Sequence, residues 1–108
     1  MKRGDIVLVA PPGDYGKPRP AVVIQSDRMR ATDSVLLVLM TSALEEAPIY
    51  RLQIEPASWN SLKRASQIMI EKILAMPKHN VGQVIGRLSA DELAALNSML
   101  SAVIGLAD

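Results

Sequence analysis

The opening of the chain, residues 1–27, constrains the fold more than any other part. Residues 6–10 and 21–24 are short apolar runs rich in valine and isoleucine, and residues 11–18 between them hold three prolines and two glycines. Short β-branched runs bounded by turn residues are typical of buried strands. The chain is therefore predicted to open with a strand, a loop and a second strand.

Arg19 stands between two prolines at the start of the second predicted strand. Pro18 and Pro20 each fix their own φ and push the preceding residue towards extended geometry. A guanidinium held in this way loses less conformational freedom when it meets a ligand, and its planar fork suits a phosphate better than an ammonium group does. Arg19 is thus a candidate phosphate-binding residue. The alternative is an exposed surface arginine at the start of a strand.

Four further segments have the length and hydropathy of strands. Residues 35–40 are wholly apolar, residues 67–76 form a second candidate that Pro77 ends, and residues 81–88 form one that glycines interrupt. Polar residues are spaced through 49–54, which favours a strand with one solvent-facing side. These segments predict a sheet of several short strands.

Helical patterns occur twice after the third predicted strand. Residues 56–62 resemble a short helical turn, and residues 89–92, Ser-Ala-Asp-Glu, form a capping box. An apolar stripe at helical spacing follows the box, formed by Leu93, Leu96, Leu100 and Val103. Gly105 is a plausible stop. The predicted fold is mainly β (α+β), a small, strongly curved antiparallel sheet or barrel with one C-terminal helix packed across it.

Composition narrows the class of protein. The 108 residues suit one domain, and the absence of cysteine excludes disulfides and thiolate chemistry. No run approaches the roughly 18 apolar residues of a membrane span, and no signal-peptide pattern opens the chain, so a cytoplasmic protein with no membrane association is expected. The net charge is only +1, although residues 1–30 hold six basic groups against three acids. This local excess could attract phosphates or be ordinary solvated surface.

The order of motifs resembles the MazF/PemK family of toxins from bacterial type II toxin–antitoxin pairs. Residues 3–9, Arg-Gly-Asp-Ile-Val-Leu-Val, and residues 18–27, with Arg-Pro before a valine-rich strand, match that family closely. Weaker matches follow in the same order at residues 39–42, 66–73 and 81–88. The resemblance implies a CcdB/MazF-like fold, an SH3-like barrel with a terminal helix, in a single toxin domain spanning 1–108.

The resemblance also implies an activity. Members of this family are sequence-specific endoribonucleases, or mRNA interferases, that cleave single-stranded RNA without a metal or other cofactor. The 2′-hydroxyl of the strand attacks the neighbouring phosphorus and leaves a cyclic phosphate and a free 5′-hydroxyl. Arg19 matches the arginine implied to contact the scissile phosphate, and Thr41 matches the hydroxyl residue that accompanies it. Ser42 is an adjacent donor, and the alternative role of Thr41 is to satisfy a local backbone group at the end of a strand.

Other catalytic groups are scarce. His79 is the single histidine, in the turn-like segment 77–80, so a pair of histidines within one subunit is impossible. Glu45 and Glu46 are too few for a metal site, and no metal centre is predicted. The remaining carboxylate candidate is Glu71.

Glu71 falls where some family members carry an acid, but its surroundings depart from the family pattern. Lys72 replaces a glutamine, Leu74 replaces an arginine, and Met69 stands where some members place an arginine. Glu71 is therefore either a general base or the ion-pair partner of Lys72 or Arg19.

The loop of residues 11–18 is predicted to contact RNA. Its one aromatic residue, Tyr15, either stacks on a splayed base or packs on its own turn. Lys17 adds a cation next to Arg19, and with Ser42 these residues form the predicted RNA-binding set. Sequence preference is expected to depend on this loop and on residues 43–48.

Partners follow from the same resemblance, which implies a homodimer and a cognate antitoxin whose acidic-hydrophobic tail covers the RNA grooves. Two alternatives remain. CcdB-like toxins share the fold but poison DNA gyrase through a Trp-Gly-Ile type of C-terminus, whereas this chain ends in residues 104–108 without tryptophan and has its one tryptophan at Trp59. A degenerate, non-catalytic toxin is the second alternative, motivated by Met69 and Leu74.

Overall fold

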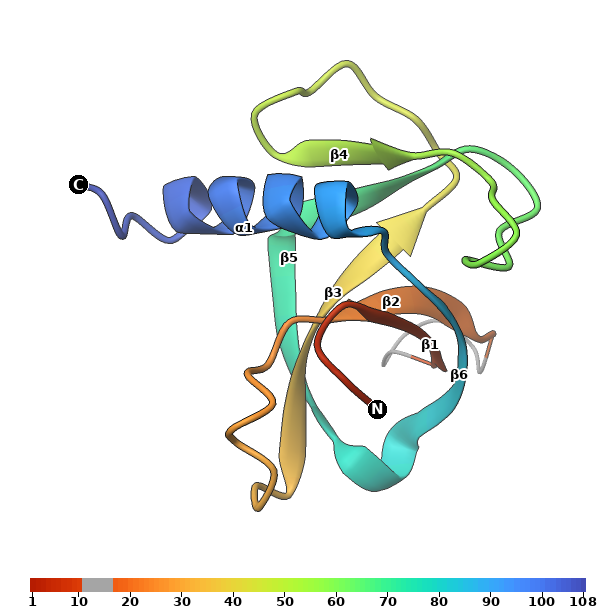
Figure 1. The fold of residues 1–108 in the computed structure, drawn as a ribbon, viewed down its shortest axis with the longest axis vertical. Coiled ribbons are helices and arrows are strands. Elements are labelled where there is room, and N and C mark those ends of the chain that lie inside the picture. The colour runs from red at the N-terminus through yellow and green to blue at the C-terminus, as the bar shows by residue number, and fades with distance from the viewer. Residues whose placement is uncertain (11–16) are drawn as a thin grey trace.

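The part of the chain that the structure describes contains six strands and one long helix (Figure 1). The computed structural model describes residues 1–10 and 17–108. In chain order the elements are β1 (Asp5–Val9), β2 (Arg19–Val23), β3 (Ser34–Thr41), β4 (Arg51–Ile54), β5 (Ser66–Pro77), a 3-10 turn (Lys78–Asn80), β6 (Val81–Arg87) and α1 (Ala90–Val103).

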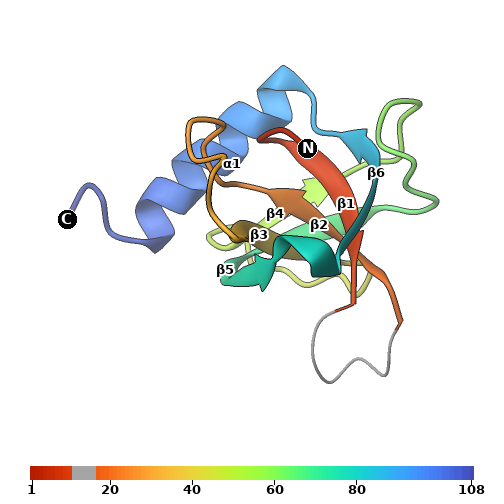
Figure 2. The same ribbon diagram turned by 90° about the horizontal axis from the view of Figure 1, so that it is seen from below.

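The strands form one antiparallel sheet in the order β4-β5-β3-β2-β1-β6. Only the turn Lys78–Asn80 joins β5, the second strand of this order, to β6 at the far edge. So short a connection requires the sheet to curl, and Figure 2 shows β1 and β6 curving round beside the turn that ends β5. The predicted curved antiparallel sheet with one C-terminal helix is confirmed.

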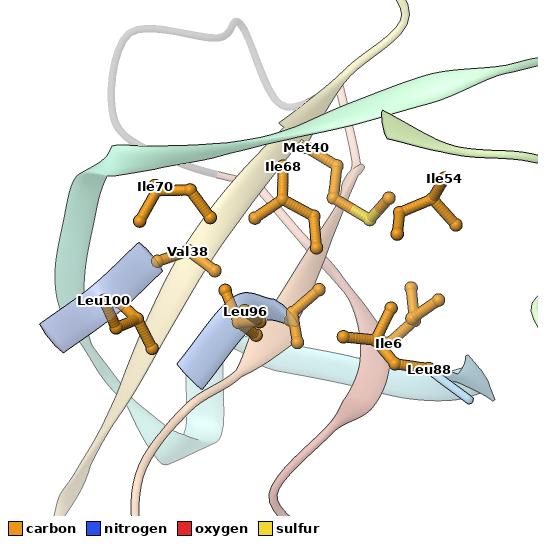
Figure 3. Close-up of a cluster of buried hydrophobic side chains, with 10 residues drawn as sticks. Ile6, Val38, Met40, Ile54, Ile68, Ile70, Leu88, Leu96 and Leu100 are labelled. Carbon is orange, nitrogen blue, oxygen red and sulfur yellow. The ribbon is translucent and has the colours of Figure 1, made fainter. Parts of the chain in front are cut away.

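Both faces of the sheet contribute to the core, since alternate side chains of a strand point to opposite sides and buried residues occur on each side. One face packs against α1 through a cluster formed by Ile6, Val22, Val38, Met40, Ile54, Ile68, Ile70, Leu88, Leu96 and Leu100 (Figure 3). The alternate residues form a second cluster inside the curl: Val7, Val9, Ala21, Val23, Val35, Leu37 and Met76. Branched aliphatic side chains therefore fill a core in a chain that has no phenylalanine.

The start of α1 confirms the predicted capping box. Ser89 Oγ accepts a hydrogen bond from the Glu92 N–H at 3.1 Å, and Glu92 Oε1 accepts one from the Ser89 N–H at 2.8 Å. Two of the amides that a helix N-terminus leaves without intrahelical partners are satisfied in this way. Gly105 follows the helix with φ +75°, a conformation that glycine adopts without a Cβ penalty.

One strand boundary was predicted wrongly. The fourth strand begins at Arg51 rather than at residue 49, since the Tyr50 and Arg51 amides both donate to the Ala47 carbonyl and close a turn there. Within residues 56–62 the Asn60 N–H donates to the Ala57 carbonyl at 3.2 Å, which closes a single turn that does not continue into a helix. It is organised by the buried Asn60 side chain, whose Oδ1 accepts from the Ala57 and Leu62 amides and whose Nδ2 donates to the Glu55 carbonyl.

Candidate functional site

A pocket of about 320 Å³ opens where β2 begins and β3 ends. Its lining combines one cation, hydroxyl groups and a small apolar floor: Arg19, Pro20, Met40, Thr41, Ser42, Ala43 and Ser66. Three of the residues singled out from the sequence, Arg19, Thr41 and Ser42, therefore lie together although Arg19 is more than twenty positions from the other two in the chain.

Strand register explains why Arg19 and Thr41 meet. In the β2–β3 pair Ala21 lies opposite Leu39, and continuing this register by two residues brings Arg19 opposite Thr41. Side chains two residues apart on a strand share a face, so Arg19 follows Ala21 and Thr41 follows Leu39 on the same side of the sheet. The apolar residues buried further along β2 and β3 thus keep the two strands paired. This pairing holds the polar residues Arg19 and Thr41 together at the strand ends.

The hydroxyl of Thr41 has a defined orientation. Its Oγ1 accepts a hydrogen bond from the Ala43 N–H at 3.1 Å, which turns the chain after β3. A hydroxyl carries one proton and two lone pairs, so this bond leaves the Thr41 proton able to be donated. With the Arg19 guanidinium and the exposed Ser42, the pocket offers donors to an anion of phosphate size.

Glu71 is not among the residues that line this pocket. The β3–β5 register passes from Val38 opposite Ile73 to Met40 opposite Ile68, so β5 has three more residues than β3 over this interval. Glu71 lies within that irregular stretch, and its side chain is exposed.

The other predicted contact residues lie apart from the pocket or outside the described residues. Lys17 is exposed on the segment that leads into β2 and is not part of the lining. Tyr15 lies outside the described residues. His79 is exposed in the 3-10 turn after β5.

Within residues 1–10 and 17–108, no group of three or more histidine, cysteine, aspartate or glutamate residues is arranged to hold a metal ion. Over the same ranges no helix has both the length and the apolar character needed to cross a membrane.

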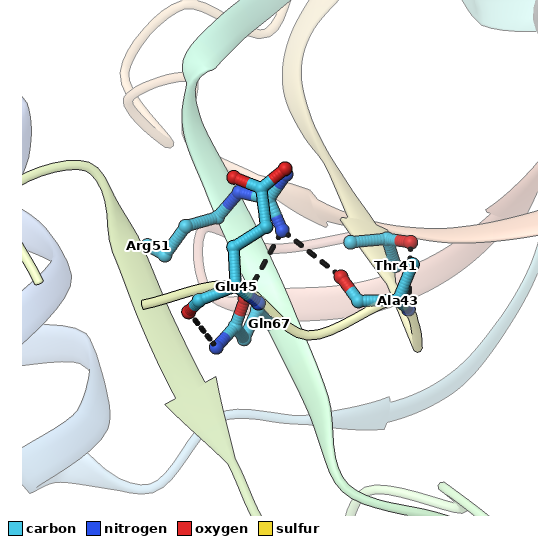
Figure 4. A network of polar contacts seen from close by, with 5 residues as sticks. All are labelled: Thr41, Ala43, Glu45, Arg51 and Gln67. Carbon is cyan, nitrogen blue, oxygen red and sulfur yellow. Dashed lines mark hydrogen bonds and ion pairs between the residues drawn. The ribbon is translucent and has the colours of Figure 1, made fainter. Parts of the chain in front are cut away.

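Sequence reasoning missed the residues that support the pocket from behind. Ser66, at the start of β5, completes the lining, and its Oγ donates to the Arg64 carbonyl at 3.1 Å. Gln67 and Arg51 hold the loop after Thr41 through the hydrogen bonds drawn in Figure 4. The available signal was a polar residue, Gln67, next to the apolar run of a buried strand.

Comparisons with known proteins agree with this architecture. Residues 2–104 match the family described as PemK-like, MazF-like toxin of type II toxin–antitoxin system. The probable endoribonuclease MazF of Mycolicibacterium smegmatis is 38% identical over 108 residues, which cover 99% of both chains.

Solved structures show the same fold. A mycobacterial endoribonuclease solved with its cognate antitoxin superimposes with a TM-score of 0.82 at 19% identity, covering 98% of this chain and 96% of that one. A MazE–MazF structure from Deinococcus radiodurans gives a TM-score of 0.77 at 18% identity, covering 97% and 95%. The family match and the 38% identical relative favour a MazF-type toxin over the gyrase poison. By its sequence match over almost its whole length, the chain belongs to the PemK-like, MazF-like toxins of type II toxin–antitoxin systems.

Proposed function

We propose that this toxin is a sequence-specific endoribonuclease that cleaves single-stranded RNA and thereby arrests growth. The observation that carries the proposal is the pocket that joins Arg19, Thr41 and Ser42 at the ends of β2 and β3. The relative from Mycolicibacterium smegmatis, named as a probable endoribonuclease, supports it.

The chemistry follows from what the pocket can stabilise. Attack of an RNA 2′-hydroxyl on the adjacent phosphorus builds a crowded phosphorane that carries more negative charge on its oxygens than the starting phosphodiester. A guanidinium fork and hydroxyl donors aimed at those oxygens lower the barrier, because they bind the charge more strongly as it develops. Arg19 is assigned to the phosphate oxygens, and Thr41 and Ser42 donate alongside it.

The nucleophile belongs to the RNA itself, so the first step requires no activated water. Its products are a 2′,3′-cyclic phosphate on one fragment and a 5′-hydroxyl on the other. As the new bond from the 2′-oxygen to phosphorus forms, the 2′-hydroxyl proton passes to water and the bond from phosphorus to the 5′-oxygen breaks. The leaving 5′-oxygen takes up a proton from water, and the Arg19 guanidinium stabilises its charge. We assign this chemistry to Arg19, Thr41 and Ser42 and leave Glu71 outside it, because Glu71 is not part of the pocket lining.

RNA on either side of the scissile bond would extend along the loops that flank the pocket. For Lys17, exposed two residues before Arg19, we propose contact with a neighbouring phosphate. For Tyr15 we propose stacking on an unpaired base. The toxin would act in the cytoplasm as a homodimer.

A cognate antitoxin is the expected inhibitor, since related toxins have been solved together with theirs. An acidic segment with apolar anchors would compete with RNA phosphates for Arg19 and would cover exposed aliphatic side chains such as Leu44, on the loop after β3. Folding on binding would let a disordered tail cover a wide surface.

The first experiment is cleavage of a long mixed-sequence RNA by the purified, antitoxin-free protein in excess EDTA, with the new 5′ ends sequenced. Cuts at one short motif, bearing 5′-hydroxyl ends and absent with Arg19→Ala, are expected. Arg28→Ala is the matched control, because it also removes one exposed arginine but lies outside the pocket.

Absence of cleavage by the folded wild-type protein would overturn the nuclease proposal. A parallel DNA supercoiling assay with gyrase then separates the remaining alternatives. Inhibition of gyrase would indicate a CcdB-like poison, and no effect in either assay would indicate a non-catalytic member of the family.

A further inference from the structure

The loop between β3 and β4, residues 42–50, is held by two side chains that come from other strands. Gln67 lies at the start of β5, opposite Thr41 on one side and opposite Gln53 on the other. Arg51 is the first residue of β4. Both side chains are directed at the backbone of the loop, as Figure 4 shows.

Gln67 binds the backbone of one loop residue, Glu45, in both directions. Its Oε1 accepts from the Glu45 N–H at 3.1 Å, and its Nε2 donates to the Glu45 carbonyl at 3.0 Å. This pair of bonds has the same pattern as the two N–H···O=C bonds that a hydrogen-bonded residue pair makes between antiparallel strands. Gln67 is only 5% exposed, so water competes little for these bonds.

Arg51 links Gln67 to a second point of the loop. Its Nη1 donates to Gln67 Oε1 at 3.0 Å and to the Ala43 carbonyl at 3.2 Å, and its Nη2 lies 3.5 Å from the Glu45 carboxylate. The Arg51 side chain is 8% exposed. Its guanidinium therefore joins three acceptors while it is largely removed from water.

Ala43 connects this network to the pocket. Its carbonyl is bound by Arg51, and its N–H donates to Thr41 Oγ1. The position of the Ala43 backbone decides which lone pair of Thr41 Oγ1 accepts this bond. It therefore also decides the direction in which the Thr41 proton can be donated. Continuous hydrogen bonds thus run from buried Gln67 and Arg51 to the hydroxyl beside Arg19.

We propose that Gln67 and Arg51 are positioning residues, which hold Thr41 and Ser42 in the geometry that Arg19 needs. The inference rests on the proposed nuclease function. Burying a charged group is costly unless its donors are satisfied, and Arg51 Nε is buried without a hydrogen-bond partner within the described residues. A buried arginine with an unsatisfied Nε contributes little to the stability of the edge strand β4. Its bonds to Ala43 and Gln67 instead fix the position of the loop after β3.

Gln67→Leu removes both bonds to Glu45 at nearly constant volume. Gln53→Leu is the matched control, because Gln53 is exposed, has the same side chain on the neighbouring strand, and makes no bond to the loop. It removes only the 3.5 Å bond that Gln53 Oε1 accepts from Gln67 Nε2 and leaves the bonds between Gln67 and Glu45 in place. In single-turnover cleavage Gln67→Leu is expected to lower the rate constant by about 10- to 100-fold while the RNA dissociation constant changes by less than about threefold. Gln53→Leu is expected to change neither.

A double mutant separates positioning from a general loss of structure. Thr41→Val removes the hydroxyl at constant shape. If Gln67 acts through Thr41, Gln67→Leu combined with Thr41→Val cleaves no more slowly than Thr41→Val alone. A cleavage rate in the double mutant that is reduced by the product of the two single-mutant losses would overturn the proposal.

Arg51 provides a second route if Gln67→Leu does not fold. Arg51→Lys keeps a cation that reaches one acceptor, whereas Arg51→Met keeps only the packing. Partial activity of the lysine variant with a greater loss in the methionine variant, at equal RNA affinity, is expected. Equal wild-type rates in both folded variants would overturn the proposal.

Hydrogen exchange distinguishes failure of this inference from failure of the nuclease proposal. In Gln67→Leu the Ala43 and Glu45 amides are expected to exchange at least about tenfold faster than in the wild type, whether or not the wild type cuts RNA. Unchanged exchange of the Ala43 and Glu45 amides in Gln67→Leu would be enough to overturn the positioning role, whatever the cleavage result. Faster exchange in a protein whose wild type cuts no RNA would support loop positioning and overturn the nuclease function alone.

Discussion

Arg19 and Thr41 line the same pocket from the adjoining ends of two neighbouring antiparallel strands. One contributes a cation and the other a hydroxyl that already accepts a backbone hydrogen bond. The β2–β3 register holds them together, so their separation is set by the buried part of the sheet rather than by the loops.

Replacing Arg19 tests the part of the site that binds charge. Arg19→Lys is expected to retain a small fraction of RNA cleavage and Arg19→Ala none, because an ammonium group cannot form two parallel bonds to a phosphate. The free energy of unfolding should change by less than about 1 kcal/mol in both, since the side chain is exposed. Single-turnover cleavage and urea unfolding measure the two quantities. Full activity of a folded Arg19→Ala protein would remove Arg19 from the mechanism.

Glu71→Gln tests the general-base hypothesis. Because the Glu71 carboxylate lies outside the pocket lining, cleavage is expected to stay within about threefold of the wild-type rate across the pH range. The measurement is the single-turnover rate constant against pH. A large loss, together with disappearance of the rise in rate with pH on the acidic side of the profile, would restore the base role to Glu71.

Gly86→Ala is expected to destabilise the fold. A Cβ at position 86 would stand 2.6 Å from both Asn60 Cα and the Trp59 carbonyl oxygen, which are backbone atoms of a turn fixed by the buried Asn60 side chain. The expected loss of unfolding free energy is about 1–3 kcal/mol, measured by urea denaturation. Gln83→Ala on the same strand is the control, since its side chain is exposed. Equal stability of the two variants would show that the turn shifts freely.

Ser89→Ala removes the N-cap of α1. Loss of the bond from the Glu92 amide, and of the reciprocal geometry, is expected to lower the free energy of unfolding by about 1 kcal/mol. Ser98→Ala, in the exposed middle of the same helix, should be neutral or slightly stabilising, because alanine has the higher helix propensity. Calorimetric Tm values for the two variants provide the comparison. A neutral Ser89→Ala would mean that water replaces the cap.

The candidate site was only partly predictable from the sequence. Arg19 was visible because its two flanking prolines are a local signal, and the Ser89 cap and the helical stripe after it are local as well. Ser66 and Arg51 carry no such signal, and Gln67 is marked only as a polar residue beside an apolar run. Their contribution depends on strands that meet only in the folded sheet, where Gln67 lies between Thr41 and Gln53.

The sequence by itself determined where most strands and the helix form, because β-branched runs, prolines, glycines and capping residues act over a few neighbours. Tertiary structure decided which of these segments pair, and in which register. Pairing placed Arg19 with Thr41, gave β5 the irregular stretch that holds Glu71, and pressed Gly86 against Asn60. The physical reason is that register and bulges are chosen by burial on both faces of a curved sheet, a free energy summed over contacts between residues far apart in the chain.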